Sequence, residues 1–167
     1  GKIIGGGLPV GAYGGRKDIM DKVSPVGPVY QAGTLSGNPL AVAAGLASLR
    51  LLKSEPQVYE NIERKAEMLA KGVAAAAAAA GVTMTINRVA SMVTFFFNPG
   101  PVTDWDSAAA SRTDVFGAFF RAMLDRGIYL PCSQYEAAFV SAALSEDDIQ
   151  ATIQAAEASL KEVASKS

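Results

Sequence analysis

The sequence predicts the end of an α/β domain over residues 1–55, followed by a small α+β domain over residues 56–167 with an antiparallel sheet. Three observations support this fold class. Glycine-rich turns surround two short apolar runs near the start of the chain. Two long helical patterns follow each other before residue 81. The pattern then changes to β-rich segments that alternate with helical ones.

The first domain is predicted to hold one strand and two helices. Pro9–Tyr13 predicts a short strand that two glycines end, and Arg16–Val23 predicts a short helix. The stretch between this helix and the next is rich in proline and glycine and is predicted as a loop. Asn38 suits the N-cap and Pro39 the first helical position, so the second helix should run to about Lys53.

The second domain begins with the longest predicted helix. Pro56 stands near its first position, and Gly81 suits the position just after its last turn. Residues 74–80 are all alanine, the best helix former, and we expect this tract to be an exposed or loosely packed helix end. Residues 82–88 and 91–97 then predict two strands.

The rest of the second domain alternates between helices and strands. Val115–Asp125 carries apolar residues at helical spacing and predicts a helix. Residues 127–131 and 137–143 predict two more strands. Ser145 is expected to cap the final helix, with Asp148 three residues later completing a capping box.

The composition argues against several classes of function. The net charge is −1, which leaves no basic surface for nucleic acid or acidic membranes, and no apolar run could span a bilayer. The chain has no histidine and one cysteine, so its residues cannot form a Ser-His or Cys-His site, and a metal site is not expected. The lone Cys132 fits a reducing compartment and is expected to be a small buried residue rather than a nucleophile.

Lys2 is the first candidate functional residue, because it stands two apolar residues ahead of a triple glycine. A desolvated lysine has a neutral amine, which can bond covalently to an aldehyde. The simpler interpretation from the residues alone is a solvated lysine, since most lysines lie at the surface.

Gly33 and Thr34 form the second candidate site, together with the following Ser36-Gly37-Asn38 segment. A hydroxyl and free N–H groups ahead of a helix N-terminus can bind a phosphate. The residues alone equally describe an ordinary loop that ends in an N-cap, and this simpler interpretation is favoured.

Glu136 is the third candidate, in the segment SQYEAAF. A carboxylate among apolar residues is either an active-site group or a charge that points outward from an edge strand. Strand alternation favours the outward charge when this residue is considered alone.

Taken together, GKIIGGGLPVGAYGG and YQAGTLSGNPLAVAAG resemble the fold-type I, class III PLP-dependent enzymes, and within them the glutamate-1-semialdehyde 2,1-aminomutase family. The resemblance continues through FFFNPGPV and GIYLPCSQYEAAFVS to the last helix. It implies that the chain, which lacks an initiator methionine, is a C-terminal fragment. Residues 1–55 would be the end of the large PLP-binding domain and residues 56–167 the small C-terminal domain.

The resemblance also implies roles for particular residues. Lys2 would carry the covalent bond to PLP, and Gly33 and Thr34 would bind the cofactor phosphate of the neighbouring subunit in a homodimer. Glu136 would lie at the active site. Cys132 departs from the family pattern, which has proline there, as does Ala138, where glycine is usual.

The implied reaction converts (S)-4-amino-5-oxopentanoate into 5-aminolevulinate for tetrapyrrole biosynthesis. PLP would cycle through its pyridoxamine phosphate form, and Lys2 would move protons between substrate and cofactor. The family's partner for the pyridinium nitrogen precedes the lysine, so this fragment alone is expected to be inactive. A soluble enzyme of the bacterial cytoplasm or of the plastid stroma is implied.

Two alternatives stay open. One is a class III transaminase that acts on another amino acid or amine. Those enzymes commonly have a histidine and a Thr-Phe pair in the segment that matches Gln31–Leu35, and the Gln-Ala-Gly-Thr-Leu found here favours the aminomutase. The other is a non-catalytic dimerisation domain or partial gene product.

Overall fold

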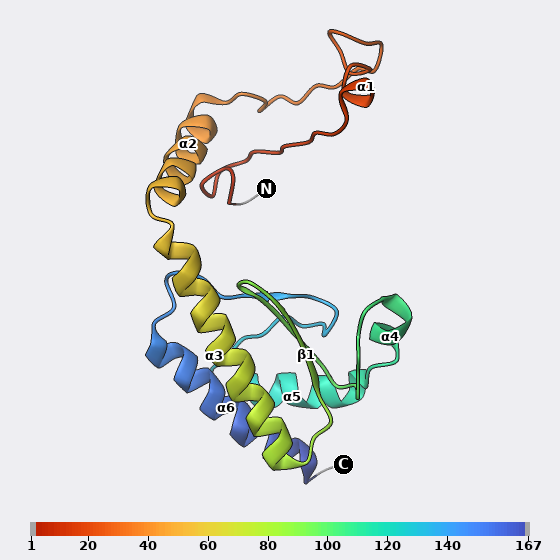
Figure 1. The fold of residues 1–167 in the computed structure, drawn as a ribbon, viewed down its shortest axis with the longest axis vertical. Coiled ribbons are helices and arrows are strands. Elements are labelled where there is room, and N and C mark those ends of the chain that lie inside the picture. Colours follow the sequence, from red (N-terminus) through yellow and green to blue (C-terminus); the bar gives the residue numbers. More distant parts are fainter. Residues whose placement is uncertain (1–2, 166–167) are drawn as a thin grey trace. The chain divides into compact units, whose positions relative to one another are not determined.

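The computed structural model describes residues 3–165 and divides the chain into two compact units, Gly1–Pro56 and Gln57–Ser167. Figure 1 draws both units, and each is described here by itself. Lys2 lies outside the described residues. No helix within residues 3–165 is long and apolar enough to cross a membrane.

Among its described residues, the first unit holds two helices, of which α1 (Lys17–Met20) is a single turn and shorter than the predicted Arg16–Val23. The predicted strand Pro9–Tyr13 is wrong, because the segment has no regular secondary structure. A strand is stable where a neighbouring strand takes up its N–H and C=O groups. All sheet strands among the described residues belong to the second unit.

Helix α2 (Pro39–Ser54) confirms the second predicted helix. Asn38 caps it, since its Oδ1 accepts hydrogen bonds from the N–H groups of Leu40 and Ala41 at 3.1 and 3.2 Å. The glycine turn at residues 3–7 packs closely on α2, where a Cβ at Gly6 would lie 2.7 Å from the carbonyl oxygen of Ala44. Gly6, which has no side chain, therefore lets this turn lie directly against the helix.

The second unit contains the predicted antiparallel sheet, in the order β1 (Thr85–Val89), β2 (Met92–Phe96) and β3 (Ala138–Phe139). The strand predicted at 127–131 is wrong, and the one at 137–143 is reduced to two residues. The segment that contains Gln134 contacts the end of β2 through a side chain instead, because Oε1 of Gln134 accepts the N–H of Phe97.

Helices α3 (Gln57–Ala80) and α6 (Glu146–Ala164) lie side by side and form the core with one face of the sheet and with α5 (Thr113–Asp125) (Figure 1). The segment between β2 and α5, for which no helix is predicted above, contains the additional helix α4 (Trp105–Ala109). Sheet residues that face this core alternate along β2 and its extension, as a half-buried strand requires: Val93, Phe95 and Phe97.

The alanine tract is only partly exposed. Ala76 and Ala77 are 7% and 3% exposed and belong to the core, so the expectation of an exposed helix end is wrong for them. Small side chains on α3 let α6 approach closely, and at Gly72 a Cβ would lie 2.5 Å from Cδ1 of Ile153. Packing against α6 decides which alanines are buried.

Local signals at the helix ends are confirmed. Gly81 has a positive φ of 69°, and the N–H of Val82 donates to the carbonyl of Ala77 at 2.9 Å, which closes the C-terminus of α3. Ser145 and Asp148 form the predicted capping box of α6. These short-range hydrogen bonds fix where the two long helices end and begin.

Candidate functional site

The turn that precedes α2 is the first candidate site, and it contains both Gly33 and Thr34. The N–H of Ser36 donates to the carbonyl of Gly33 at 2.9 Å, and the N–H of Asn38 donates to that of Leu35 at 3.1 Å. These bonds fold the segment back on itself ahead of the helix. Gly37 adopts a φ of 70°, which favours glycine at this position.

This turn leaves hydrogen-bond donors unused. Within residues 3–165, the backbone N–H groups of Thr34, Leu35 and Gly37 donate to no other protein group. Thr34 is exposed, and its hydroxyl also has no partner in that part of the chain. The sixteen-residue helix α2 adds the positive end of its dipole at the same place.

A hollow of about 460 Å³ lies against the turn. Two segments of the first unit line it, residues 9–11 and residues of the 33–42 stretch that include Gly33 and Ser36. A Cβ at Gly33 would lie 2.9 Å from Oγ of Ser36, so glycine keeps the turn tight. Free N–H groups, hydroxyls and a helix N-terminus beside a hollow can bind an anion such as a phosphate.

Glu136 belongs to the second unit, in a turn that ends just before β3 rather than on a strand. Its N–H donates to the carbonyl of Ser133 at 3.2 Å, and the residue is exposed. Within residues 3–165, its carboxylate makes no ion pair or hydrogen bond. The side chain is therefore available to bind a ligand group.

A groove of about 650 Å³ extends from Glu136 between the 127–140 segment and α6. Most of its lining is apolar, and its polar members include Cys132 and Asp148. The hydrogen bond from the Ser145 side chain, followed by that from the Ser145 backbone, lowers the pKa of Asp148. Asp148 is therefore ionised at neutral pH and already engaged in capping α6.

Cys132 is exposed, so the expectation of a small buried residue is wrong. It lies in the irregular segment that leads from α5 to β3, where the backbone does not enter the sheet. The described cysteine, aspartate and glutamate side chains form no group that could hold a metal ion.

Sequence analysis missed two features around Glu136. Gln134 is 2% exposed, and Tyr135 packs on Trp105 of α4 with ring centroids 5.3 Å apart. One signal could have indicated that Gln134 belongs to the site: it stands two residues before Glu136, in the segment that leads into β3. Nothing in the local sequence indicates the Trp105 contact, because it joins segments that lie far apart in the chain.

Comparison with known proteins gives the relatives of this chain. Residues 1–160 match the class-III aminotransferase family. The chain is 58% identical, over 99% of its length, to a glutamate-1-semialdehyde 2,1-aminomutase from Heliobacterium modesticaldum. It is 59% identical, over 93% of its length, to the enzyme of the same name from Sorangium cellulosum. It spans only 38% and 35% of the lengths of these two proteins.

Solved structures share the fold. An omega-transaminase from Sphaerobacter thermophilus matches with a TM-score of 0.80 and 26% identity, over 98% of this chain and 37% of that one. A structure described as a transaminase with PLP bound matches with a TM-score of 0.79 and 30% identity, over 99% of this chain and 38% of that one. These matches confirm the predicted fold class. The chain therefore belongs to the class-III aminotransferase family.

Proposed function

We propose that this chain is the C-terminal part of a PLP-dependent glutamate-1-semialdehyde 2,1-aminomutase. The whole enzyme would convert (S)-4-amino-5-oxopentanoate into 5-aminolevulinate, an isomerisation that serves tetrapyrrole biosynthesis. The observation that carries this proposal is the 54–59% identity to curated aminomutases across nearly the whole chain. Identity to the solved transaminases described above is only 26–30%.

The turn before α2 is the proposed phosphate site of the cofactor. The oxygens of a phosphate dianion suit the N–H groups of Thr34, Leu35 and Gly37, which have no acceptor within residues 3–165, and the hydroxyl of Thr34. Bound PLP would supply an electron sink that stabilises negative charge on the carbon that loses a proton.

Lys2 is proposed to bond covalently to the cofactor through Nζ. The support is its place in the sequence, directly ahead of the glycine turn that packs on α2. Once released from that bond, the neutral Nζ amine can move a proton between the substrate carbon and the cofactor. A Lys2→Ala enzyme is expected to lose this step.

Glu136 is proposed to contact the substrate. A carboxylate oxygen accepts hydrogen bonds from an amino group, and the side chain of Glu136 is exposed beside a groove and has no protein partner among residues 3–165. The apolar lining of that groove would limit water around the bound molecule.

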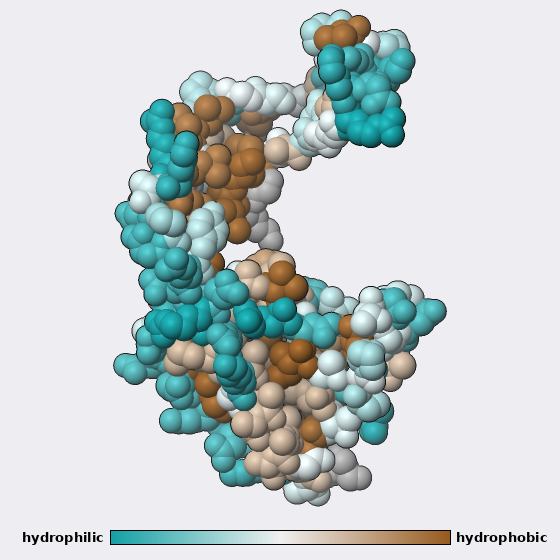
Figure 2. All heavy atoms as spheres, viewed as in Figure 1, coloured by the Kyte–Doolittle hydropathy of each residue, from teal (hydrophilic) through white to brown (hydrophobic). Residues whose placement is uncertain are grey.

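We propose that the enzyme is a homodimer in which the 33–38 turn serves the neighbouring subunit's cofactor. Apolar side chains stand exposed ahead of this turn, with Val26 at 76%, Val29 at 53% and Tyr30 at 83%. Figure 2 also shows apolar residues gathered over α2, within the first unit. Exposed apolar surface of this kind suits an interface. Sedimentation of the full-length enzyme tests the dimer, and an active monomer contradicts it.

The first unit is proposed to be the end of a large cofactor-binding domain and the second the small C-terminal domain. The second unit has its own core of helices and sheet, whereas α2 buries only Ala41 and Gly45. The curated relatives named above are bacterial, which supports the bacterial cytoplasm over the plastid stroma as the location.

Product analysis of the full-length enzyme tests the proposed reaction. Given glutamate 1-semialdehyde and PLP, it should produce 5-aminolevulinate in the amount of substrate consumed, since no amino group leaves in an isomerisation. A transaminase would instead release a carbonyl product and require an amino acceptor. Release of that product without 5-aminolevulinate would show that the chain belongs to a transaminase.

A further inference from the structure

Gln134 is a buried glutamine in which only the amide oxygen has a hydrogen-bond partner within residues 3–165. Its Oε1 accepts the N–H of Phe97 at 3.4 Å. Because a backbone N–H can only donate, this bond identifies the oxygen and places Nε2 at the other edge of the amide. Nε2 is buried, and within residues 3–165 it has no hydrogen-bond partner. Buried amide donors are nearly always satisfied, so Nε2 requires an acceptor.

A small cavity lies beside this amide. Its volume is about 10 Å³, which admits about one water molecule. The lining is mostly apolar, but Ser133, Gln134 and Glu136 all contribute to it. Ser133 Oγ accepts the N–H of Tyr135 at 3.2 Å, which leaves its hydroxyl hydrogen free to donate.

These three side chains offer the number and kind of polar groups that a buried water needs, which is two to four partners. The water oxygen can accept from Nε2 of Gln134 and from the hydroxyl of Ser133. Its own hydrogen can then be donated to the carboxylate of Glu136. Every group acts in the direction that its chemistry allows.

We propose that this cavity holds one ordered water that joins Gln134 to Glu136, and that Gln134 is thereby a positioning residue for Glu136. Glu136 lines both this cavity and the large groove, so the water would hold one face of the carboxylate while the other faces the groove. The catalytic consequence rests on the proposed function, whereas the water site itself does not.

A high-resolution crystal structure of the full-length enzyme tests the water directly. The expected result is one ordered water within about 3.2 Å of both Gln134 Nε2 and a carboxylate oxygen of Glu136. The inference is overturned if the cavity is empty while other buried waters are visible. It is also overturned if Nε2 donates directly to a protein group.

A double-mutant cycle in the full-length enzyme tests the positioning role. Gln134→Leu should lower kcat/KM about tenfold in the wild-type background and less than about twofold in a Glu136→Gln background, because the two residues act together. The pH dependence of kcat should change with Gln134→Leu as well. Equal losses in both backgrounds overturn the role. Gln154→Leu, the same change at an exposed site on α6, is the control and should leave activity unchanged.

A second variant covers the case in which Gln134→Leu does not fold. Ser133→Ala removes one partner of the water and keeps the Gln134–Phe97 bond. It should lower kcat/KM about threefold, again only when Glu136 is present. An active enzyme without the water overturns this inference alone. An enzyme that holds the water but makes no 5-aminolevulinate overturns the proposed function alone.

Discussion

At the scale of single residues, Thr34 gives the most direct test of the phosphate site. Thr34→Val keeps the shape of the side chain and removes the hydroxyl. Losing one hydrogen bond to a charged group should raise the PLP dissociation constant of the full-length enzyme by about tenfold or more. Absorbance titration measures it. Thr113→Val, at an exposed threonine that begins α5, is the matched control, and an equal change there would contradict the site.

Two serines should respond in opposite directions to the same substitution. Ser159 is fully buried in α6, and its Oγ has no partner within residues 3–165. Ser159→Ala removes an unsatisfied group and adds helix propensity, so the free energy of unfolding should rise by about 0.5 kcal/mol. Ser145→Ala removes the N-cap of the same helix and should lower it by about 1 kcal/mol. Urea denaturation measures both, and a loss of stability in Ser159→Ala would indicate a hidden partner.

At the scale of elements, alanine substitutions at two helical glycines should also change the stability in opposite directions. Gly72→Ala places a Cβ within 2.5–2.9 Å of three side-chain atoms of Ile153, so α3 and α6 must move apart. The cost of overpacking, about 1–3 kcal/mol, exceeds the gain in helix propensity of about 1 kcal/mol. Gly117→Ala in α5 meets only Arg121 at 3.5 Å and should stabilise by about 0.5–1 kcal/mol. Thermal unfolding compares the two, and stabilisation by both would contradict the close packing of α3 on α6.

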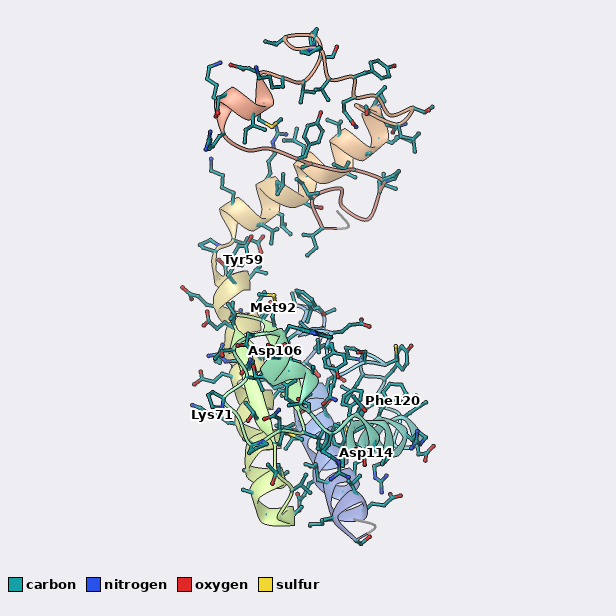
Figure 3. All side chains as sticks on the ribbon, turned by 90° about the vertical axis from the view of Figure 1, so that its right-hand side faces the viewer. Tyr59, Lys71, Met92, Asp106, Asp114 and Phe120 are labelled. Carbon is teal, nitrogen blue, oxygen red and sulfur yellow. The ribbon has the colours of Figure 1, made fainter. Side chains whose placement is uncertain are left out.

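An ion pair in the first turn of α5 should make the free energy of unfolding depend on pH in the acidic range. Arg112 donates two hydrogen bonds to Asp114, which lies at the start of α5 in Figure 3, at 2.8 and 2.5 Å. This pairing lowers the pKa of Asp114 to about 2 from 3.8. A lowered pKa in the folded state contributes stability that is complete above about pH 4 and is lost as the pH falls toward 2.

Asp114→Asn should therefore lower the urea midpoint at pH 5, with the difference from wild type shrinking as the pH falls through 2 and vanishing below it. Salt should reduce this difference, because the pair is exposed. Asp125→Asn removes a negative charge from the negative end of the same helix and should raise the midpoint instead. A difference for Asp114→Asn that grows as the pH falls would contradict the pairing.

At the scale of the whole molecule, signals within a few residues could be predicted and distant pairings could not. Asn38, Gly81 and Ser145 end or begin helices through bonds to residues at most five positions away, so the sequence indicates them directly. The segment 127–131 has strand composition, but whether a strand forms depends on a neighbour far along the chain. The burial of Ala76 depends likewise on where α6 packs.

In the candidate sites, too, the local features could be predicted from the sequence and the contacts between distant segments could not. The turn at Gly33 and Thr34 was predictable, because its hydrogen bonds are local and it precedes a capped helix. Around Glu136, the groove and the Nε2 of Gln134, which has no partner within residues 3–165, arise where β2, α6 and the 127–140 segment meet. No local pattern could have indicated that arrangement.

Chemical mapping of the cofactor attachment tests the central claim most directly. The full-length enzyme is loaded with PLP and reduced with borohydride, which makes any bond between a lysine and the cofactor permanent. Digestion and mass spectrometry then locate the added group. The addition is expected on Lys2, at one per subunit, and is expected to be absent from a Lys2→Ala variant. Attachment to another lysine such as Lys17 or Lys22, or no attachment at all, would contradict it.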